Sequence, residues 1–196
     1  MLDHINTAYK ECIQTLISSG DAVATQLEQS ATAMVQCLLN GNKVITCGTG
    51  PSLMLANHLA SLLVNYFEIE RPCLPAMCLN NTMENMALFS DNSTDPSEGY
   101  ARQIRALGQE NDILIAIAPT GYEKAVISAV EASLTKDMIV IALTGGDGGE
   151  LAGLLGSNDV EIRAPSNRPA RIIETHLFNV HCLCELVDNT LFNQSF

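Results

Sequence analysis

The sequence predicts an α/β fold: a doubly wound, five-stranded parallel sheet with an N-terminal helical hairpin and a long C-terminal helix. Five short apolar runs alternate with amphipathic stretches of helical length, which is the order of a βα repeat. The runs are continuously apolar, a pattern typical of parallel strands that are buried on both faces. Helical periodicity at both ends of the chain adds the hairpin and the closing helix.

Length and composition favour a single domain. At 196 residues with 47% hydrophobic content, the chain is of ordinary size for one domain with its own core. We expect residues 1–196 to form this domain, with the helical hairpin at 1–41 used in oligomerisation and the α/β core with its C-terminal helix at 42–196. No internal repeat or low-complexity tract divides the chain.

Charge and cysteine content limit the classes of function. A formal net charge of −12 leaves ten lysines and arginines, which form no basic stripe of the kind that neutralises nucleic-acid phosphates. No apolar stretch is long enough to span a membrane, and the N-terminus lacks the features of a secretory signal. Seven cysteines, an odd number, indicate reduced core residues. We expect a soluble cytoplasmic protein that contacts neither nucleic acid nor a membrane directly.

The elements follow from the spacing of apolar residues. Two amphipathic helices come first, with apolar positions from Ile5 to Ile17 and from Val23 to Leu38, and Gly41 ends the second. Continuous apolar runs predict strands at 43–47, 74–79, 112–118, 138–143 and 160–163. Helices are predicted at 51–66, 82–89, 98–107, 122–135, 148–155 and 168–192. The polar loop 90–97 is predicted to be mobile.

The closing helix is apolar on more than one face. A stripe from Ile173 to Leu191 is widened by Ile172, Leu183 and Leu186, so the helix needs cover on two sides. A homo-oligomer that packs the terminal helices between subunits would provide this cover. A helix buried between its own sheet and the hairpin fits the pattern nearly as well.

The strand-to-helix turn 47–52 is a candidate anion site. It combines two glycines and a proline with Ser52 at the start of a helix. It has neither the third glycine of a dinucleotide fingerprint nor the Gly-Lys pair of a P-loop, so a nucleotide site is weakly supported. A tight structural turn and anion binding through Ser52 compete evenly.

The next strand also leads into a candidate anion cradle. Exposed backbone N–H groups and the helix dipole after this strand favour an anion near Thr120. However, Ala118 and Pro119 offer no hydroxyl, and Glu123 puts a negative charge where a phosphate would need to sit. Phosphate binding is therefore disfavoured, and catalysis with it.

Two histidines on predicted helices, His58 and His181, are the candidate catalytic or metal-binding residues. The position one turn after His58 is Leu62, so the carboxylate expected beside a metal-binding or proton-transferring histidine is missing. Arg168 and Arg171 near a helix start indicate either an acidic partner or a simple pairing of Arg171 with a nearby glutamate. We predict no catalytic residue, no metal site and no cofactor.

The chain resembles the SIS (sugar isomerase) domain family. The resemblance covers nearly the whole sequence and rests on the turn 47–52, the strand 112–118, the segment 142–149 and the segment 160–165. It is strongest with the phosphoheptose isomerase-like branch and with its members that associate with the replication initiator DnaA. More specific matches lie at 38–43, 103–108, 148–156, 182–184 and 188–192.

This resemblance implies a flavodoxin-like sheet and a homotetramer with helices from both chain ends in its interfaces. The isomerases' metal or catalytic positions match His58, Leu62, Ile173 and His181, so two of the four groups are lost. Zinc is implied only for an active isomerase. In the phosphate loop, whose family pattern is rich in Ser and Thr, the matching positions keep a hydroxyl only at Thr120.

The same resemblance implies a role in starting chromosome replication. A Leu-Phe pair that contacts DnaA in these relatives matches Leu191 and Phe192, although core packing of the last helical turn explains the pair about equally well. We therefore expect a noncatalytic tetramer that binds DnaA. The alternatives are an isomerase of sedoheptulose 7-phosphate, in which His58 and His181 act, and a sensor that binds a sugar phosphate without converting it.

Overall fold

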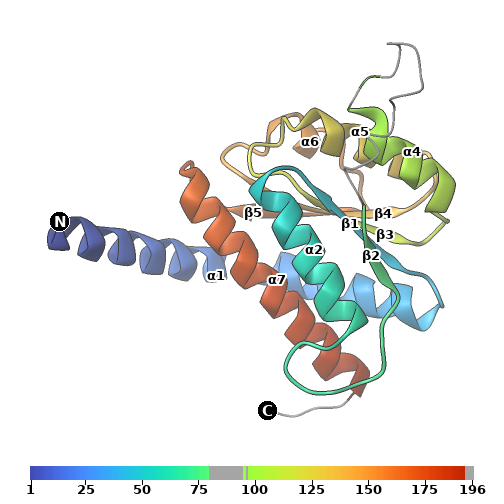
Figure 1. Ribbon diagram of the computed structural model, residues 1–196, viewed down its shortest axis with the longest axis horizontal. Coiled ribbons are helices and arrows are strands. Elements are labelled where there is room, and N and C mark those ends of the chain that lie inside the picture. Colours follow the sequence, from blue (N-terminus) through green and yellow to red (C-terminus); the bar gives the residue numbers. More distant parts are fainter. Residues whose placement is uncertain (80–94, 96, 193–196) are drawn as a thin grey trace.

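Five parallel strands form one sheet in the order β2-β1-β3-β4-β5 in the computed structural model, which describes residues 1–79, 95 and 97–192 (Figure 1). The strands are β1 (Val44–Gly48), β2 (Ala76–Cys78), β3 (Ile113–Ile117), β4 (Ile139–Gly145) and β5 (Val160–Ala164). All five predicted strands are confirmed, with ends shifted by one or two residues. The predicted helix 82–89 and all of the loop 90–97 except Asp95 and Ser97 lie outside the described residues.

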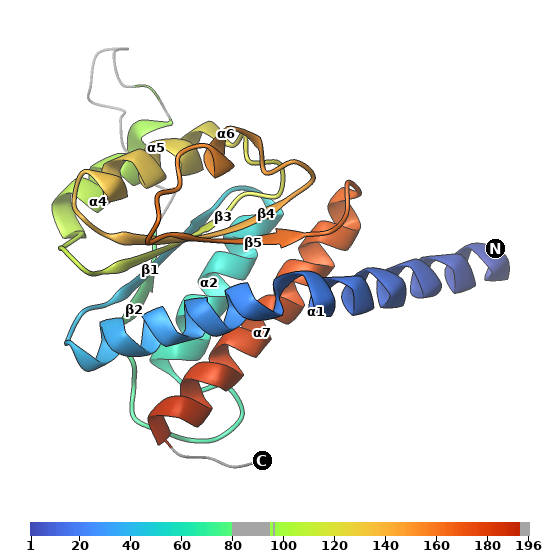
Figure 2. The ribbon, with the colours of Figure 1, turned by 180° about the vertical axis from the view of Figure 1, so that it is seen from behind.

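Helices cover both faces of the sheet, so the predicted doubly wound architecture is confirmed (Figures 1 and 2). One face carries α1 (Leu2–Leu39), α2 (Pro51–Val64) and α7 (Pro169–Phe192). The other carries α4 (Glu98–Leu107), α5 (Lys124–Leu134) and α6 (Gly149–Ala152). Among the described residues, no helix is both long enough and apolar enough to cross a membrane.

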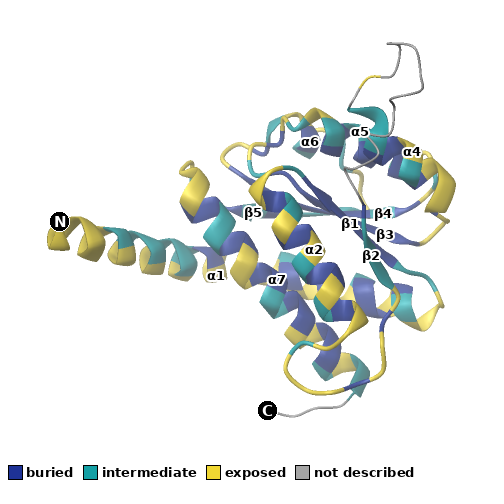
Figure 3. Cartoon of the chain, in the orientation of Figure 1, coloured by how far each residue is buried: buried dark blue, intermediate teal, exposed yellow. Residues whose placement is uncertain are grey.

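Alternate strand residues supply the two cores; the central strands β1, β3 and β4 are almost completely buried, whereas the edge strands β2 and β5 are largely half-buried (Figure 3). Val44 and Ile113 point toward α1, α2 and α7, whereas Ile45 and Leu114 point toward α4 and α5. Because both faces are covered, the strand sequences are apolar without interruption, as expected for parallel strands. All seven cysteines are free thiols; Cys37, Cys47 and Cys184 are buried, whereas Cys73 is exposed.

The predicted N-terminal hairpin is wrong: residues Leu2–Leu39 form one continuous 38-residue helix. The small polar residues around Gly20 resemble a turn, but the segment contains no proline, and a single glycine costs a helix only about 1 kcal/mol. A reversal there would break several backbone hydrogen bonds. The helix ends where predicted: Gly41 has φ 79°, its N–H bonds to Leu38 O, and Asn42 N–H bonds to Cys37 O.

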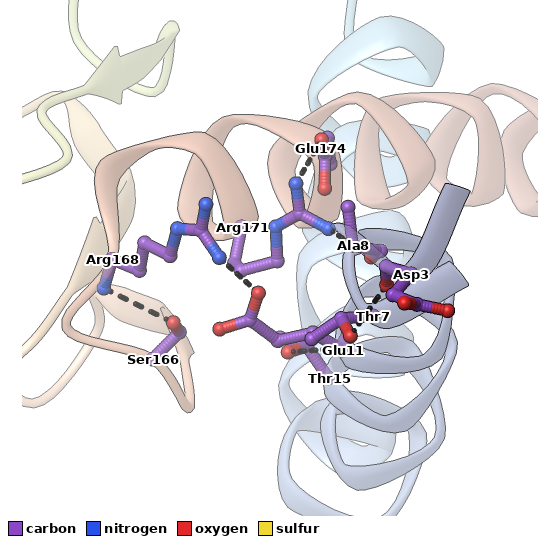
Figure 4. A network of polar contacts seen from close by, with 9 residues as sticks. All are labelled: Asp3, Thr7, Ala8, Glu11, Thr15, Ser166, Arg168, Arg171 and Glu174. Carbon is purple, nitrogen blue, oxygen red and sulfur yellow. Dashed lines mark hydrogen bonds and ion pairs between the residues drawn. The ribbon is translucent and has the colours of Figure 1, made fainter. Parts of the chain in front are cut away.

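The first half of α1 projects beyond the sheet and is held by α7 (Figures 2 and 4). Arg171 Nη1 donates to Ala8 O at 2.8 Å and its Nη2 pairs with Glu174 at 2.9 Å, while Arg168 pairs with Glu11. Of the two roles predicted for these arginines, internal pairing is the one observed. Both cations are used to join the start of α7 to α1.

Candidate functional site

The strand order places a topological switch point between β1 and β3, because the chain moves outward from there in both directions. Ligands of doubly wound sheets bind in the crevice at the carboxyl ends of such strands. The turn after β1 carries Ser52, and the loop after β3 carries Thr120. The fold therefore puts both candidate ligand-binding residues on the connections that border the switch point.

The turn between β1 and α2 is a tight structural turn. A Cβ on Gly48 would lie 2.7 Å from the carbonyl carbon of Ser52, so only glycine lets the helix start this close to the strand. Tyr100 OH donates to Gly48 O at 2.7 Å and fixes the turn from the other face. Ser52 is 1% exposed, and its Oγ has no hydrogen-bond partner among the described residues. This buried hydroxyl is an unused polar group at the start of α2.

The loop after β3 fills its own anion position. The side chain of Glu123 turns back so that Oε1 accepts a hydrogen bond from the backbone N–H of Thr120 at 3.1 Å. The Thr120 hydroxyl accepts from Tyr122 N–H at 3.2 Å. Groups that would bind a phosphate are thus occupied within the loop, and a fixed carboxylate stands beside them. The predicted negative charge of Glu123 therefore lies within the candidate anion cradle itself, because its carboxylate accepts the hydrogen bond from the Thr120 N–H.

Backbone contact between two loops shapes the neighbouring cavity. A Cβ on Gly121 would lie 1.9 Å from Gly148 O, and Leu151 N–H bonds to Gly121 O at 3.0 Å. The glycines of the β4–α6 loop therefore let it press against the β3–α5 loop. A cavity of about 350 Å³ opens beside them, bordered by Thr120, Tyr122, Asp147, Asn167 and Ile172. The carboxylates of Asp147, which borders the cavity, and of Glu123, which belongs to the neighbouring β3–α5 loop, make the cavity unfavourable for an anion.

His58 and His181 meet between α2 and α7. Their Nε2 atoms are 3.0 Å apart, so one ring donates and the other accepts, and the rings are edge to face with centroids 5.2 Å apart. Phe67 packs on His181 with a centroid distance of 5.4 Å. Burial, followed by repulsion from His58, lowers the pKa of His181, while Glu68 opposes the shift. The His181 ring therefore favours its neutral state.

The donors around this pair do not fit a zinc site. Catalytic zinc is bound by three protein ligands and a water, commonly with a carboxylate among them. Leu62 and Ile173 occupy the two matching positions, and the two imidazoles bond to each other. Within the described part of the chain, no cluster of three or more His, Cys, Asp or Glu side chains is arranged to hold a metal ion.

The C-terminal pair lies about 30 Å from the cavity, judged from the helical rise between Ile172 and Phe192 along α7. Leu191 and Phe192 are half-buried against the α1–α2–α7 core. The guanidinium of Arg71 lies 5.9 Å from the centroid of the Phe192 ring. Each residue packs on the core and keeps some exposed surface, so core packing is observed and the role of the pair as a partner anchor stays a prediction.

Two residues of these sites were missed in the sequence. Arg71 is buried and pairs with Asp188 at 2.7 Å, and its isolation as the single basic residue between 44 and 101 was the available signal. His176 is fully buried, with Nε2 2.8 Å from Thr144 O. Burial lowers the pKa of His176 to about 4, so its ring is neutral at ordinary pH. The available signal was helical spacing, because His176 lies four residues after Ile172 and four before Val180 on the buried face of α7.

Comparison with known families agrees with this geometry. The sequence profile of the SIS domain matches residues 8–145. The chain belongs to the SIS domain family. The matched region runs from the first turns of α1 to the end of β4. It therefore includes both connections that carry candidate anion sites, the one after β1 and the one after β3.

Relatives of this SIS-domain chain include proteins named DnaA initiator-associating protein DiaA. The one from Pectobacterium carotovorum subsp. carotovorum (strain PC1) is 51% identical over 193 residues, covering 98% of this chain and 97% of that protein. The one from Photorhabdus laumondii subsp. laumondii is 50% identical over 192 residues with the same coverage.

Solved structures to which this chain is similar include two phosphoheptose isomerases. The enzyme from Francisella tularensis matches with a TM-score of 0.89 and 43% identity, covering 96% of this chain and 98% of that one. The enzyme GmhA from Neisseria gonorrhoeae matches with a TM-score of 0.86 and 33% identity over the same shares. The chain is thus similar to two groups of proteins that carry different names, the initiator-associating proteins and the phosphoheptose isomerases.

Proposed function

We propose that this SIS-domain protein binds the replication initiator DnaA and promotes timely initiation of chromosome replication, without catalysing sugar isomerisation. The observation that carries this proposal is 51% identity, along nearly the full length of both chains, to a DnaA initiator-associating protein. A cytoplasmic location follows from this role.

The geometry of the switch-point loops supports a noncatalytic role. An aldose-ketose isomerase must hold an anionic substrate and move a proton with a positioned base and acid. Here the Glu123 carboxylate takes the Thr120 N–H, and the His58–His181 pair has no carboxylate at Leu62. Neither requirement is met by the residues in place, and we propose that the protein works without a metal or cofactor.

Exposed apolar surface supports a homotetramer. Ile5, Tyr9, Ile13 and Ile17 follow one another at four-residue spacing on the projecting half of α1 and are 48–68% exposed. On α7, Leu177 and Phe178 are 38% and 51% exposed. Such surface is unusual for a monomer and typical of an interface between identical chains. Several copies of Leu191 and Phe192 would then be presented by one assembly.

Binding to purified DnaA tests this proposal. We expect the wild-type protein to bind, and the double variant Leu191→Ala with Phe192→Ala to bind at least about tenfold more weakly, since a central apolar anchor typically contributes 2 kcal/mol or more. Leu107→Ala, at a residue 41% exposed on α4, is the matched control. Failure of the wild type to bind, or unchanged binding by the double variant in an intact assembly, contradicts the partner or the site respectively.

An isomerase is the second candidate, favoured by 43% identity to the Francisella tularensis enzyme over nearly the whole chain. Incubation with sedoheptulose 7-phosphate, with and without added zinc, distinguishes it. We expect no product in either condition. Product formation would contradict the noncatalytic proposal, and a thermal shift without product would indicate a sugar-phosphate sensor.

A further inference from the structure

The loop between α2 and β2 is fastened to the last turns of α7 by a single buried arginine. Arg71 Nε bonds to Asp188 Oδ1 at 2.7 Å, and Nη1 donates to Leu63 O at 2.8 Å. Nη2 donates to Leu62 O at 3.0 Å, so the guanidinium also caps the end of α2. The same group lies over Phe192. In both ribbon views the loop runs beside the C-terminal end of α7 (Figures 1 and 2).

The outer side of this loop alternates apolar and acidic residues. Tyr66 and Ile69 are 50% and 42% exposed, and Glu68 and Glu70 are exposed between and beside them. Phe67 turns inward and packs on His181. Because Arg71 and Phe67 hold the two ends, the exposed side chains are presented from a fixed backbone, which reduces the entropy lost on binding.

This end of the molecule is negatively charged without local compensation. The sequence has no lysine or arginine after Arg171, and the charge of Arg71 is already paired with Asp188. Among the described residues, Glu68, Glu70 and Glu185 take part in none of the ion pairs. A partner that carries positive charge is therefore attracted to this surface, and an acidic one is repelled.

We propose that the loop surface formed by Tyr66, Glu68, Ile69 and Glu70 is the second half of the docking site for DnaA and receives an apolar segment that bears lysine or arginine. This inference rests on the proposed function and extends it from the Leu191–Phe192 anchor to a neighbouring charged rim. An apolar centre surrounded by charge is the usual anatomy of a specific interface. The apolar pair supplies affinity, and the two glutamates supply orientation and association rate.

Charge reversal at the loop tests the inference. Affinity for purified DnaA is measured at several salt concentrations for the wild type and for Glu68→Lys with Glu70→Lys. We expect about tenfold or greater weakening for the loop variant, because like charges then face the partner, and a loss or reversal of the salt dependence, because added salt screens attraction in the wild type and repulsion in the variant. The control variant, Glu110→Lys with Glu131→Lys, makes the same charge change at two exposed residues, Glu110 before β3 and Glu131 on α5. Its affinity for DnaA should stay within about twofold of the wild-type value.

A second variant removes the apolar part of the loop without altering its charge. Tyr66→Ala with Ile69→Ala should also weaken binding about tenfold while leaving the salt dependence unchanged. If both loop variants bind as the control does while Leu191→Ala with Phe192→Ala does not, this inference is overturned and the proposed function stands. If the wild type itself does not bind DnaA, the proposed function fails and takes this inference with it.

Discussion

At the scale of single residues, Glu123 decides what the switch-point crevice accepts. Its Oε1 holds the Thr120 N–H, and its Oε2 is buried without a partner among the described residues. A carboxylate with one unsatisfied oxygen is costly, and it persists here within a loop that is otherwise suited to an anion. The side chain therefore blocks the site by occupying it, in addition to repelling other anions.

Replacing this carboxylate should restore anion binding. We expect Glu123→Ser to free the Thr120 N–H and to gain a rise in melting temperature with sedoheptulose 7-phosphate that the wild type lacks. At a ligand concentration about 100 times Kd, the free energy of unfolding increases by about 2.7 kcal/mol. Glu131→Ser, on the exposed face of α5, is the control. An equal response from wild type and Glu123→Ser would show that Glu123 does not block the cradle.

Asp112 makes stability depend on acid pH. Its side chain is fully buried and accepts hydrogen bonds from Lys43 Nζ, the N–H groups of Lys43 and Gln109, and Asn42 Nδ2. Burial by itself would raise the pKa of Asp112, but these bonds outweigh it and hold the pKa below its ordinary value. A lowered folded-state pKa stabilises the protein above the unfolded-state pKa, near 4, and the contribution is lost as pH falls through the folded-state value.

Asp112→Asn should therefore lower the free energy of unfolding by about 2–3 kcal/mol at neutral pH, since hydrogen bonds to a charged group are lost. The difference from wild type should begin to shrink at about pH 4, where the carboxyl of the unfolded chain becomes protonated, and should be lost as pH falls through the lower folded-state pKa of Asp112. Urea unfolding at fixed protein concentration measures both effects. Asp21→Asn, exposed on α1, should change neither. A constant difference across the acid range would show that Asp112 is not the titrating group.

At the scale of elements, α1 is a helix with one half packed into the core and the other half largely exposed. Its second half is buried against the sheet through Val23, Leu27 and Met34. Its first half is joined to α7 through the contacts of Arg168 and Arg171 and exposes an apolar stripe. These contacts fix the direction in which the stripe faces, so a partner chain meets a preformed surface.

Disrupting this stripe should break the assembly. We expect Ile5→Asp with Ile13→Asp to shift the molar mass, measured by light scattering during size-exclusion chromatography, from a tetramer to smaller species. Each isoleucine buried at an interface contributes about 1.5–3 kcal/mol, and a buried carboxylate adds a further cost. Gln14→Asp, on a different face of the same helix turn, should leave the mass unchanged. A tetramer that survives the double variant would place the interface elsewhere.

At the scale of the whole molecule, the sheet was the most predictable part. Strands such as β1 and β3 are buried on both faces, and their uninterrupted apolar sequences leave no other fold class open. The N-terminal hairpin was not predictable because Gly20 and its polar neighbours satisfy a turn as readily as a helix. Whether such a segment turns depends on packing elsewhere in the chain.

The sequence identified several residues of the candidate sites, but it did not predict which of these residues contact each other. The charge of Glu123 was evident from its place after a strand, but its bond to the Thr120 N–H depends on the loop backbone. The His58–His181 contact depends on how α2 and α7 cross, 123 positions apart in sequence. Arg71 carries no motif, and its role follows from three elements that converge on it.

The length of α7 allows the two ends of the protein to change independently. Its first turn borders the cavity beside the switch-point loops, and its last turn carries Leu191 and Phe192. Side chains at the two ends of a 24-residue helix are too far apart to contact each other. Substitutions that change the cavity and substitutions that change the surface around Leu191 and Phe192 are therefore far enough apart to have independent effects.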